Sequence, residues 1–210
     1  MSGEFTKIVP CGKCVLCLKR RQKAWMFRLY EEMKASDSAA FVTLTYENSP
    51  LSFNGYPTLK KSDFQKWMKR LRKKTGSKIK YYGCGEYGST THRPHYHAIV
   101  FNIGKADRKT ADLVAQTWNL GRVHIDDCNI ATIGYTTKYL MSGNWEEFDD
   151  DDDRQPHFSL MSKKMGLNYL TPQMVRYLTD NMLAHATLPG GTLISLPRYF
   201  RDKIFSKEER

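Results

Sequence analysis

Residues 78–101 read KIKYYGCGEYGSTTHRPHYHAIVF and predict an antiparallel β-hairpin. The segments 78–86 and 94–101 contain the β-branched and aromatic residues that favour strands. Between them, residues 87–91 have the composition of a turn. Two strands with so short a connection are expected to pair in antiparallel orientation. The fold is therefore expected to contain an antiparallel sheet.

The second strand of this hairpin carries His95 and His97. Residues two apart on a strand point to the same face, so both imidazoles project together. Glu86 ends the first strand, where the hairpin can bring its carboxylate beside the two rings. Two imidazoles and one carboxylate suit a divalent ion such as Mg²⁺ or Mn²⁺ that must also hold substrate oxygen. The alternative is a pair of packed, hydrogen-bonded histidines without a metal.

A helix predicted at residues 130–141 carries Tyr135 and Tyr139. Tyrosines at i and i+4 share one helix face, with Cβ atoms about 6 Å apart, so both phenols could reach one phosphate. A free phenol has a pKa of about 10, so a nucleophilic tyrosine needs a nearby cation or metal. Lys138 lies between the two and could contact either the phosphate or the phenolate. Aromatic pairs at this spacing also occur as core residues.

Outside the hairpin, the sequence predicts two more strands and four more helices. One helix is expected to begin with Ser62 as its cap and to bury Phe64, Trp67, Met68 and Leu71, which fall at i, i+3, i+4 and i+7. The fold class is therefore α+β, built around an antiparallel sheet. The strands are expected at 41–46 and 122–125, and the helices at 15–35, 62–74, 106–118 and from Pro172, before an irregular C-terminus.

The chain is basic, with 33 Lys and Arg against 22 Asp and Glu in 210 residues and a net charge of +11. Seven of these acids lie between residues 146 and 153, so the remaining 15 face all 33 basic residues. Such a balance points to a polyanionic partner, and first to nucleic acid. The acidic run is expected to be solvated, or to act as a repulsive gate over a basic groove.

Several basic residues are candidate phosphate contacts. Besides the run at 19–23, the candidates gather on the helix at 62–74 and near the hairpin. A basic helix face can equally be a solvated face. The predicted DNA contacts are Lys66, Lys69, Arg70, Lys73 and Arg93.

Three closely spaced cysteines, Cys11, Cys14 and Cys17, form a candidate structural Zn²⁺ site. Three thiolates need a fourth ligand, which Cys84, Cys128 or a histidine could supply. Free thiols or a redox role are the alternatives. Five cysteines at this spacing do not make a disulfide framework, and no apolar run reaches the roughly 18 residues of a membrane span. We therefore expect a protein of a cytoplasm, with no membrane partner.

These motifs occur together and in order in one family. The segment CGEYG at 84–88, followed by THRPHYHAIV at 91–100, resembles the metal motif of HUH endonucleases that initiate rolling-circle replication. The segment YTTKY at 135–139 resembles their two-tyrosine motif, and FVTLTY at 41–46 resembles their first strand motif. The likeness is strongest to initiators of microviruses of the gokushovirus type, which share the motifs found here at 10–17 and 196–199.

The resemblance implies a fold and a set of roles. It implies a central antiparallel sheet of about five strands flanked by helices, in a single nuclease domain over residues 1–210 with a Cys-rich helical segment at about 10–36 and a C-terminal helical extension at about 168–210. His95 and His97 would bind the ion with Glu86 as third ligand, and Tyr135 and Tyr139 would be the nucleophiles.

The activity implied is cleavage and rejoining of single-stranded origin DNA through a 5′-phosphotyrosine and a free 3′-OH. Host helicase and polymerase would be partners, in the cytoplasm of a bacterial host. No Gly-x-x-x-x-Gly-Lys-Ser/Thr loop occurs in the chain, so no nucleotide cofactor is expected. The alternatives are a relaxase- or transposase-like HUH nuclease, and a zinc-stabilised nucleic-acid-binding protein without catalysis. The second alternative leaves the order of histidines and tyrosines unexplained.

Overall fold

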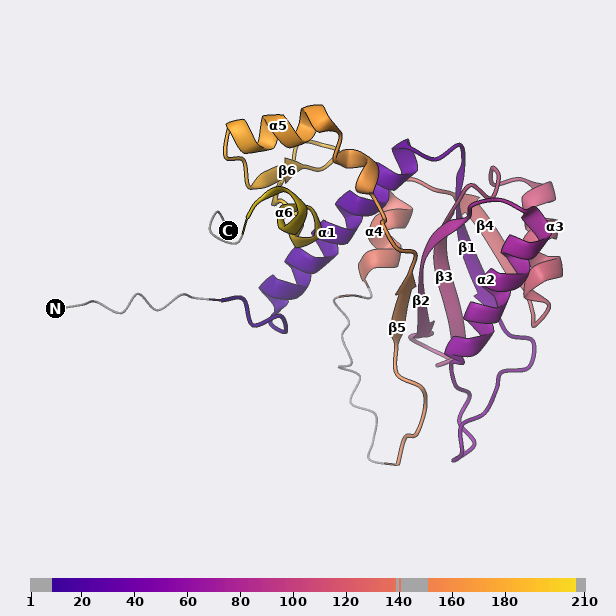
Figure 1. Ribbon diagram of the computed structural model, residues 1–210. Coiled ribbons are helices and arrows are strands. Elements are labelled where there is room, and N and C mark those ends of the chain that lie inside the picture. The colour runs from indigo at the N-terminus through magenta and orange to yellow at the C-terminus, as the bar shows by residue number, and fades with distance from the viewer. Residues whose placement is uncertain (1–8, 139, 141–150, 207–210) are drawn as a thin grey trace.

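The computed structural model describes residues 9–138, 140 and 151–206, and it confirms the α+β class (Figure 1). Its core is a five-stranded antiparallel sheet of strand order β4-β1-β3-β2-β5, with helices on both faces. The strands are β1 (Ala39–Thr45), β2 (Lys80–Tyr87), β3 (Pro94–Phe101), β4 (Val123–Asp127) and β5 (Phe158–Met161). The helices are α1 (Val15–Lys34), α2 (Lys61–Thr75), α3 (Arg108–Trp118), α4 (Ile130–Lys138), α5 (Pro172–Asp180) and α6 (Arg198–Ile204), with a short 3-10 turn η1 (Leu167–Tyr169).

The predicted hairpin is the centre of this sheet, because β3 pairs with β2 on one side and with β1 on the other. Residues that face each other across paired strands point to the same side of the sheet. His95 lies opposite Glu86 on β2, and His97 lies opposite Thr43 on β1. The register therefore gathers side chains from three strands on one face of the sheet.

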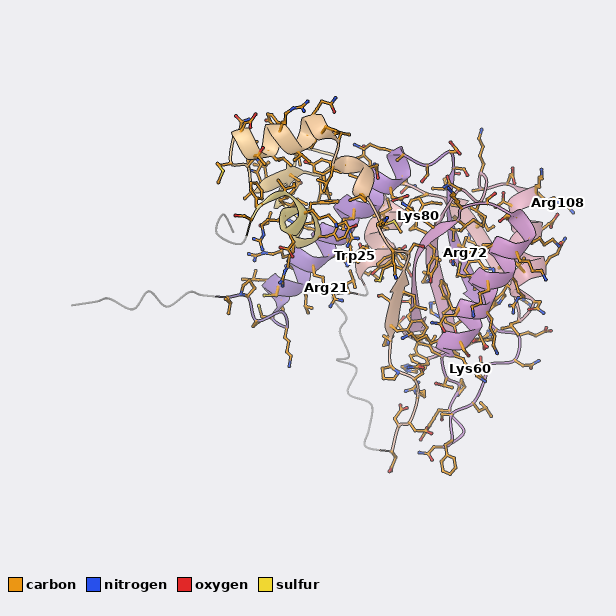
Figure 2. The ribbon with its side chains drawn as sticks, in the orientation of Figure 1. Arg21, Trp25, Lys60, Arg72, Lys80 and Arg108 are labelled. Carbon is orange, nitrogen blue, oxygen red and sulfur yellow. The ribbon has the colours of Figure 1, made fainter. Side chains whose placement is uncertain are left out.

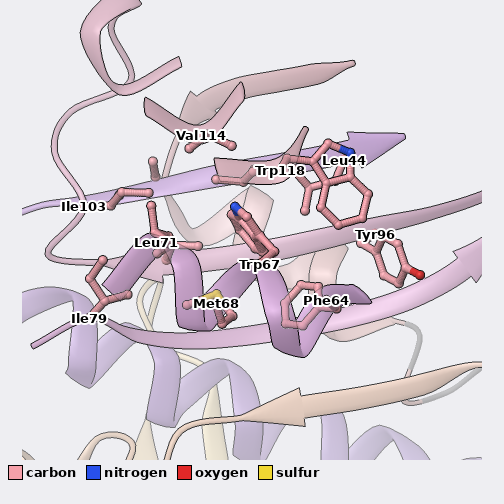
Figure 3. Packing of buried hydrophobic residues seen from close by; sticks show 14 of the residues in the cluster. Leu44, Phe64, Trp67, Met68, Leu71, Ile79, Tyr96, Ile103, Val114 and Trp118 are labelled. Atoms are coloured by element: carbon pink, nitrogen blue, oxygen red, sulfur yellow. The ribbon is translucent and has the colours of Figure 1, made fainter. Parts of the chain in front are cut away.

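Helices α2 and α3 cover the opposite face (Figure 3). The predicted stripe of α2 is confirmed, since Phe64, Trp67, Met68 and Leu71 are each no more than 1% exposed and pack against Leu44, Tyr96 and Trp118. A Cβ on Gly83 of β2 would overlap the Phe64 ring, so glycine is needed for α2 to lie this close. The basic residues of α2 consequently belong to the face of the sheet that lacks the histidines.

Helices α1 and α4 cover the face with the histidines. Leu29 of α1 and Ile133 of α4 are completely buried against Phe41, Tyr82 and other residues of that face. The Gln22 side chain donates to the Gly134 carbonyl and links the two helices directly. The N-terminus of α4 is closed by Asn129, whose side chain accepts from two backbone N–H groups. This packing positions the last turn of α4 next to the sheet.

The C-terminal elements pack on the outer side of α1 around Phe27 (Figure 1). The Phe27 ring lies 4.9 Å from Tyr169 and 6.1 Å from Phe200 in edge-on contacts. The prediction of an irregular C-terminus is wrong, because this region contains a hairpin of β6 (His185–Thr187) and β7 (Leu193–Ser195) and then α6. Strands of three residues are too short to show an alternating pattern.

Two further predictions need correction. Ser62 does not cap α2, because the helix already begins at Lys61 and Lys60 occupies the cap position without a side-chain hydrogen bond. The strand β5 was not predicted, since its four residues are all half-buried at the edge of the sheet and follow the acidic run. Across the described ranges, every helix is too short or too polar to cross a membrane.

Candidate functional site

Glu86, His95 and His97 converge at the open end of the central hairpin. One carboxylate oxygen of Glu86, Oε1, lies 2.8 Å from His95 Nε2 and 2.7 Å from His97 Nε2. Glu86 is only 2% exposed, so the sheet and α4 hold its charge away from bulk water. The three side chains each offer a ligand atom within 4.8 Å of the others, and together they could hold a metal ion. Their chemistry is that of a two-histidine, one-carboxylate site.

The second nitrogen of each imidazole fixes its orientation. His95 Nδ1 lies 3.0 Å from the Arg93 carbonyl oxygen, which can only accept, so this nitrogen carries the proton. His97 Nδ1 lies 2.9 Å from the Thr43 hydroxyl oxygen. In both neutral rings the Nε2 lone pair then points toward the Glu86 carboxylate. Three electron-rich atoms that face one another create a place for a cation.

The electrostatics of His95 show the same preference for positive charge. Burial acts to lower the pKa of His95, but the hydrogen bond and negative charge of Glu86, with the Arg93 carbonyl, outweigh burial and raise that pKa. Beneath the site, burial and then the charge of Glu86 raise the pKa of the Cys84 thiol and keep it neutral. Cys84 Sγ lies 3.7 Å from the His97 carbonyl and 3.8 Å from that of Thr136, so it packs between β3 and α4.

Tyr135 lies against this group from α4. Its ring centroid is 5.1 Å from that of His97, nearly perpendicular to it, and 6.0 Å from that of Phe41. The Tyr135 side chain is 40% exposed, which leaves room for a substrate to approach. Lys138 Nζ lies 4.2 Å from the centre of the Tyr135 ring. Tyr139 lies outside the described residues, so the structure places one of the two tyrosines that the sequence singles out.

A cleft of about 780 Å³ opens beside the three converging side chains, between β1 and β4. Thr43 and Thr45 line it from β1, and Arg122 and His124 line it from the β4 side. Arg93, a predicted DNA contact, also lines the cleft and donates from Nη2 to the Tyr46 carbonyl at 2.9 Å. Sequence reasoning missed Thr43 and Arg122. The alternation of threonines with Val42 and Leu44 could have placed Thr43 on the histidine face.

The other predicted DNA contacts do not share a surface with this site. Lys66, Lys69 and Lys73 are exposed on α2, across the sheet from the histidines. Arg70 uses its guanidinium to bind the backbone carbonyls of Thr117 and Trp118, which ties α2 to α3. The structure therefore separates the basic face of α2 from the candidate metal site by the thickness of the sheet.

The three N-terminal cysteines form a second candidate metal group. Their sulfur atoms all lie within 4.8 Å of one another, just before and in the first turn of α1. Hydrogen bonds from the backbone N–H groups of Cys14 and then Lys13 lower the pKa of the Cys11 thiol to about 7. Cys84 is buried in β2, and Cys128 Sγ contacts the sulfur of Met33 at 3.7 Å. Among the described residues neither therefore joins the cluster, which corrects two of the proposed fourth ligands.

Comparison with known proteins gives a consistent family. A family of replication-associated proteins of the ORF2 type matches residues 39–144. The chain is 25% identical over 214 residues to "Replication-associated protein VP4" of Bdellovibrio phage phiMH2K, an alignment that covers 92% of this chain and 66% of that protein. It is 29% identical over 219 residues to "Replication-associated protein ORF2" of Spiroplasma virus 4, with 95% of this chain and 68% of the relative covered.

A third relative is "Replication-associated protein ORF4" of Chlamydia phage 1, which is 26% identical over 228 residues, covering 96% of this chain and 54% of the relative. The chain thus spans between 54% and 68% of the length of these relatives. No solved structure matches the chain. The matched residues 39–144 include β1, both strands of the central hairpin and α4, which carry Glu86, His95, His97 and Tyr135. The resemblance seen in the sequence is confirmed: the chain belongs to the ORF2 family of replication-associated proteins.

Proposed function

We propose that this chain is a metal-dependent DNA endonuclease and strand transferase that initiates rolling-circle replication of a single-stranded DNA phage in the cytoplasm of its bacterial host. One observation carries the proposal. The Tyr135 ring lies edge-on against His97 in the group formed with Glu86 and His95. This arrangement sets a nucleophile beside a metal-binding group, in a chain whose relatives are named replication-associated proteins.

The chain's own residues have defined roles in this reaction. Glu86, His95 and His97 would hold Mg²⁺ or Mn²⁺ through Oε1 and the two Nε2 atoms. When bound there, such an ion draws negative charge from a non-bridging oxygen of the scissile phosphate. The Tyr135 phenol oxygen attacks the phosphorus in line as its proton is lost, and the bond from phosphorus to the 3′ oxygen breaks. The 3′ oxygen takes up a proton and leaves as a hydroxyl.

The bond exchange conserves the phosphodiester, because one phosphate ester replaces another. The product is a 5′-phosphotyrosine and a free 3′-OH that a host polymerase can extend, while a host helicase unwinds the duplex. Attack by a 3′-OH on the phosphotyrosine reverses the exchange and rejoins strands. The ammonium group of Lys138, close to the Tyr135 ring, favours the negative charge that develops on the phenol oxygen. In this proposal Tyr139 is the second nucleophile, which allows a second cut after one round of synthesis.

The test is formation of a covalent protein–DNA adduct. The protein is incubated with tiled single-stranded oligonucleotides of the viral strand and Mn²⁺, then analysed on a denaturing gel. We expect an adduct that is lost in a chelator and impaired in Tyr135→Phe and Tyr139→Phe. Tyr177→Phe is the matched control, because Tyr177 is an exposed tyrosine on α5. Absence of an adduct with every divalent ion would leave a nucleic-acid-binding protein without catalysis.

We further propose a structural Zn²⁺ at Cys11, Cys14 and Cys17. The convergence of three sulfur atoms and the lowered pKa of Cys11 support it, since thiolates are the zinc-binding form. Metal analysis of the purified protein should find about one zinc per chain that is released when the thiols are alkylated. Purified protein without zinc, in which all three thiols react freely, would overturn this assignment.

A further inference from the structure

A second cleft, of about 510 Å³, lies between the N-terminal half of α1 and residues 195–201. No acidic residue lines it. Guanidinium groups repel one another and stay charged at any ordinary pH, so gathering them without a carboxylate is unfavourable unless an anion binds there. The arginines that line this arginine cleft are Arg20, Arg21, Arg28, Arg198 and Arg201.

Arg28 is held rigidly at the base of the arginine cleft. Its guanidinium carbon lies 4.1 Å from the centre of the Trp25 ring and 4.0 Å from that of Tyr199, so it is stacked between two aromatic side chains. Its Nε donates to the Met165 carbonyl at 3.1 Å. The neighbouring carboxylate of Glu32 binds Lys80 Nζ at 2.7 Å instead. The stack fixes the direction of a charge before any ligand arrives.

The other arginines have binding capacity to spare. The buried Nε of Arg201 has no hydrogen-bond partner among the described residues. Arg20 and Arg21 are exposed, and no ion pair between described residues includes either of them. Only Arg198 is paired, with Asp202 at 3.2 Å, and its side chain is 84% exposed. An exposed pair of this kind is weak and gives way to a stronger anion.

The arginine cleft lies on the same face of the sheet as the candidate metal group. Trp25 from the cleft packs on Tyr82 of β2, with ring centroids 5.1 Å apart. Tyr82 and Glu86 share a face of β2 and are four residues apart, or about 13 Å along the strand. In Figure 2, Arg21 and Trp25 lie on α1, whereas Arg72 lies on α2 on the other side of the sheet. A few nucleotides of extended DNA would span the interval.

We propose that the arginine cleft binds the phosphates of single-stranded DNA next to the segment that is cut, and so holds the strand across the nuclease site. This inference rests on the proposed function. Five guanidinium groups spread over two segments of the chain match a row of phosphates better than one compact anion. The exposed planes of arginines also offer stacking surfaces to unpaired bases, which a duplex does not present.

The test measures DNA binding without cleavage. A fluorescent single-stranded oligonucleotide is titrated with the full chain in a chelator, and its anisotropy is followed over a range of salt concentrations. Arg20→Ala/Arg21→Ala removes two charges from the cleft, and Lys66→Ala/Lys69→Ala removes two from the far face. We expect the cleft variant to lose about tenfold in affinity per arginine. Its slope of log affinity against log salt should fall by about 1.4, with the control unchanged.

Equal losses in the two variants, or no loss in the cleft variant, would overturn the proposal. So would equal competition by duplex DNA, which would remove the single-strand assignment. Both arginines are exposed, so thermal melting should show that the variant is folded. At saturating DNA with Mn²⁺, the cleft variant should form adduct at the wild-type rate, and loss of the adduct there would place these arginines at the reacting phosphate. If the wild type forms no adduct but the binding results hold, the nuclease proposal fails and the cleft stands.

Discussion

Thr43 illustrates how a single hydroxyl can decide what a histidine does. Its Oγ1 lies 2.9 Å from His97 Nδ1, on the side of the ring away from Glu86. If that hydrogen bond holds the ring and its tautomer, Thr43→Val should weaken Mn²⁺ binding about 10- to 100-fold, because outer hydrogen bonds to metal-ligating histidines contribute on that scale. Isothermal titration calorimetry of the purified variant measures this directly.

Thr45→Val is the matched control for that measurement. Thr45 lies two residues along the same strand, but its hydroxyl donates to the Arg122 carbonyl at 3.2 Å. Its Mn²⁺ affinity should therefore stay at the wild-type value. A wild-type affinity in Thr43→Val, or an equal decrease in both variants, would show that the hydroxyl does not position His97.

Which site residues the sequence could predict follows from how local their geometry is. The His95 and His97 pair depends only on strand alternation, and Glu86 needs only the adjacent strand of the same hairpin. Thr43 depends on the pairing of β1 with β3, between residues 54 positions apart, which no local pattern encodes. Arg70 was misjudged for a related reason, since the carbonyls that bind it belong to a helix placed by tertiary packing.

At the scale of elements, prediction succeeded where the repeating pattern was long. Helices α1 and α2 extend over 20 and 15 residues, and the hairpin strands over eight each, so their periodicity is clear. Strands β5, β6 and β7 have only three or four residues and are stabilised by partners distant in sequence. Their existence is a result of packing on β2 and α1 rather than of local preference.

Helix α3 carries a pH-sensitive cap. The Asp107 side chain accepts from the Thr110 backbone N–H at 2.8 Å, and this bond lowers the pKa of Asp107. A lowered pKa in the folded state gives stability that is present above the ordinary aspartate pKa and is lost as the pH falls through the folded value. Asp107→Asn keeps an acceptor at the cap without a titrating group.

Thermal melting of both proteins from neutral pH down to about pH 3 checks this cap, since the ordinary aspartate pKa is about 3.9. The melting temperature of the wild type should fall relative to that of Asp107→Asn as the carboxylate is protonated. A constant difference between the two proteins over the whole range would contradict a contribution from the charge. Thr171→Ala is a useful control, because it removes a cap of α5 that does not titrate.

At the scale of the whole molecule, α1 joins two packing units. Leu29 belongs to the cluster over the sheet, whereas Phe27 belongs to the cluster of the C-terminal elements. The two proposed DNA-contacting regions lie on either side of this junction: Tyr135 and the metal group on the sheet, and the arginine cleft between α1 and residues 195–201. The geometry of the cleft therefore depends on contacts that the metal group does not use.

Replacing Phe27 separates these two dependences. Phe27 is 2% exposed and contacts Tyr169 and Phe200, so Phe27→Leu should leave a small void and destabilise the C-terminal cluster by about 1 kcal/mol. Hydrogen exchange should then increase over residues 169–205 and stay unchanged in β1, β2 and β3. Affinity for single-stranded DNA should decrease while Mn²⁺ binding at Glu86, His95 and His97 stays at the wild-type value. Faster exchange spread equally over the sheet would show instead that α1 couples both units into one cooperative structure.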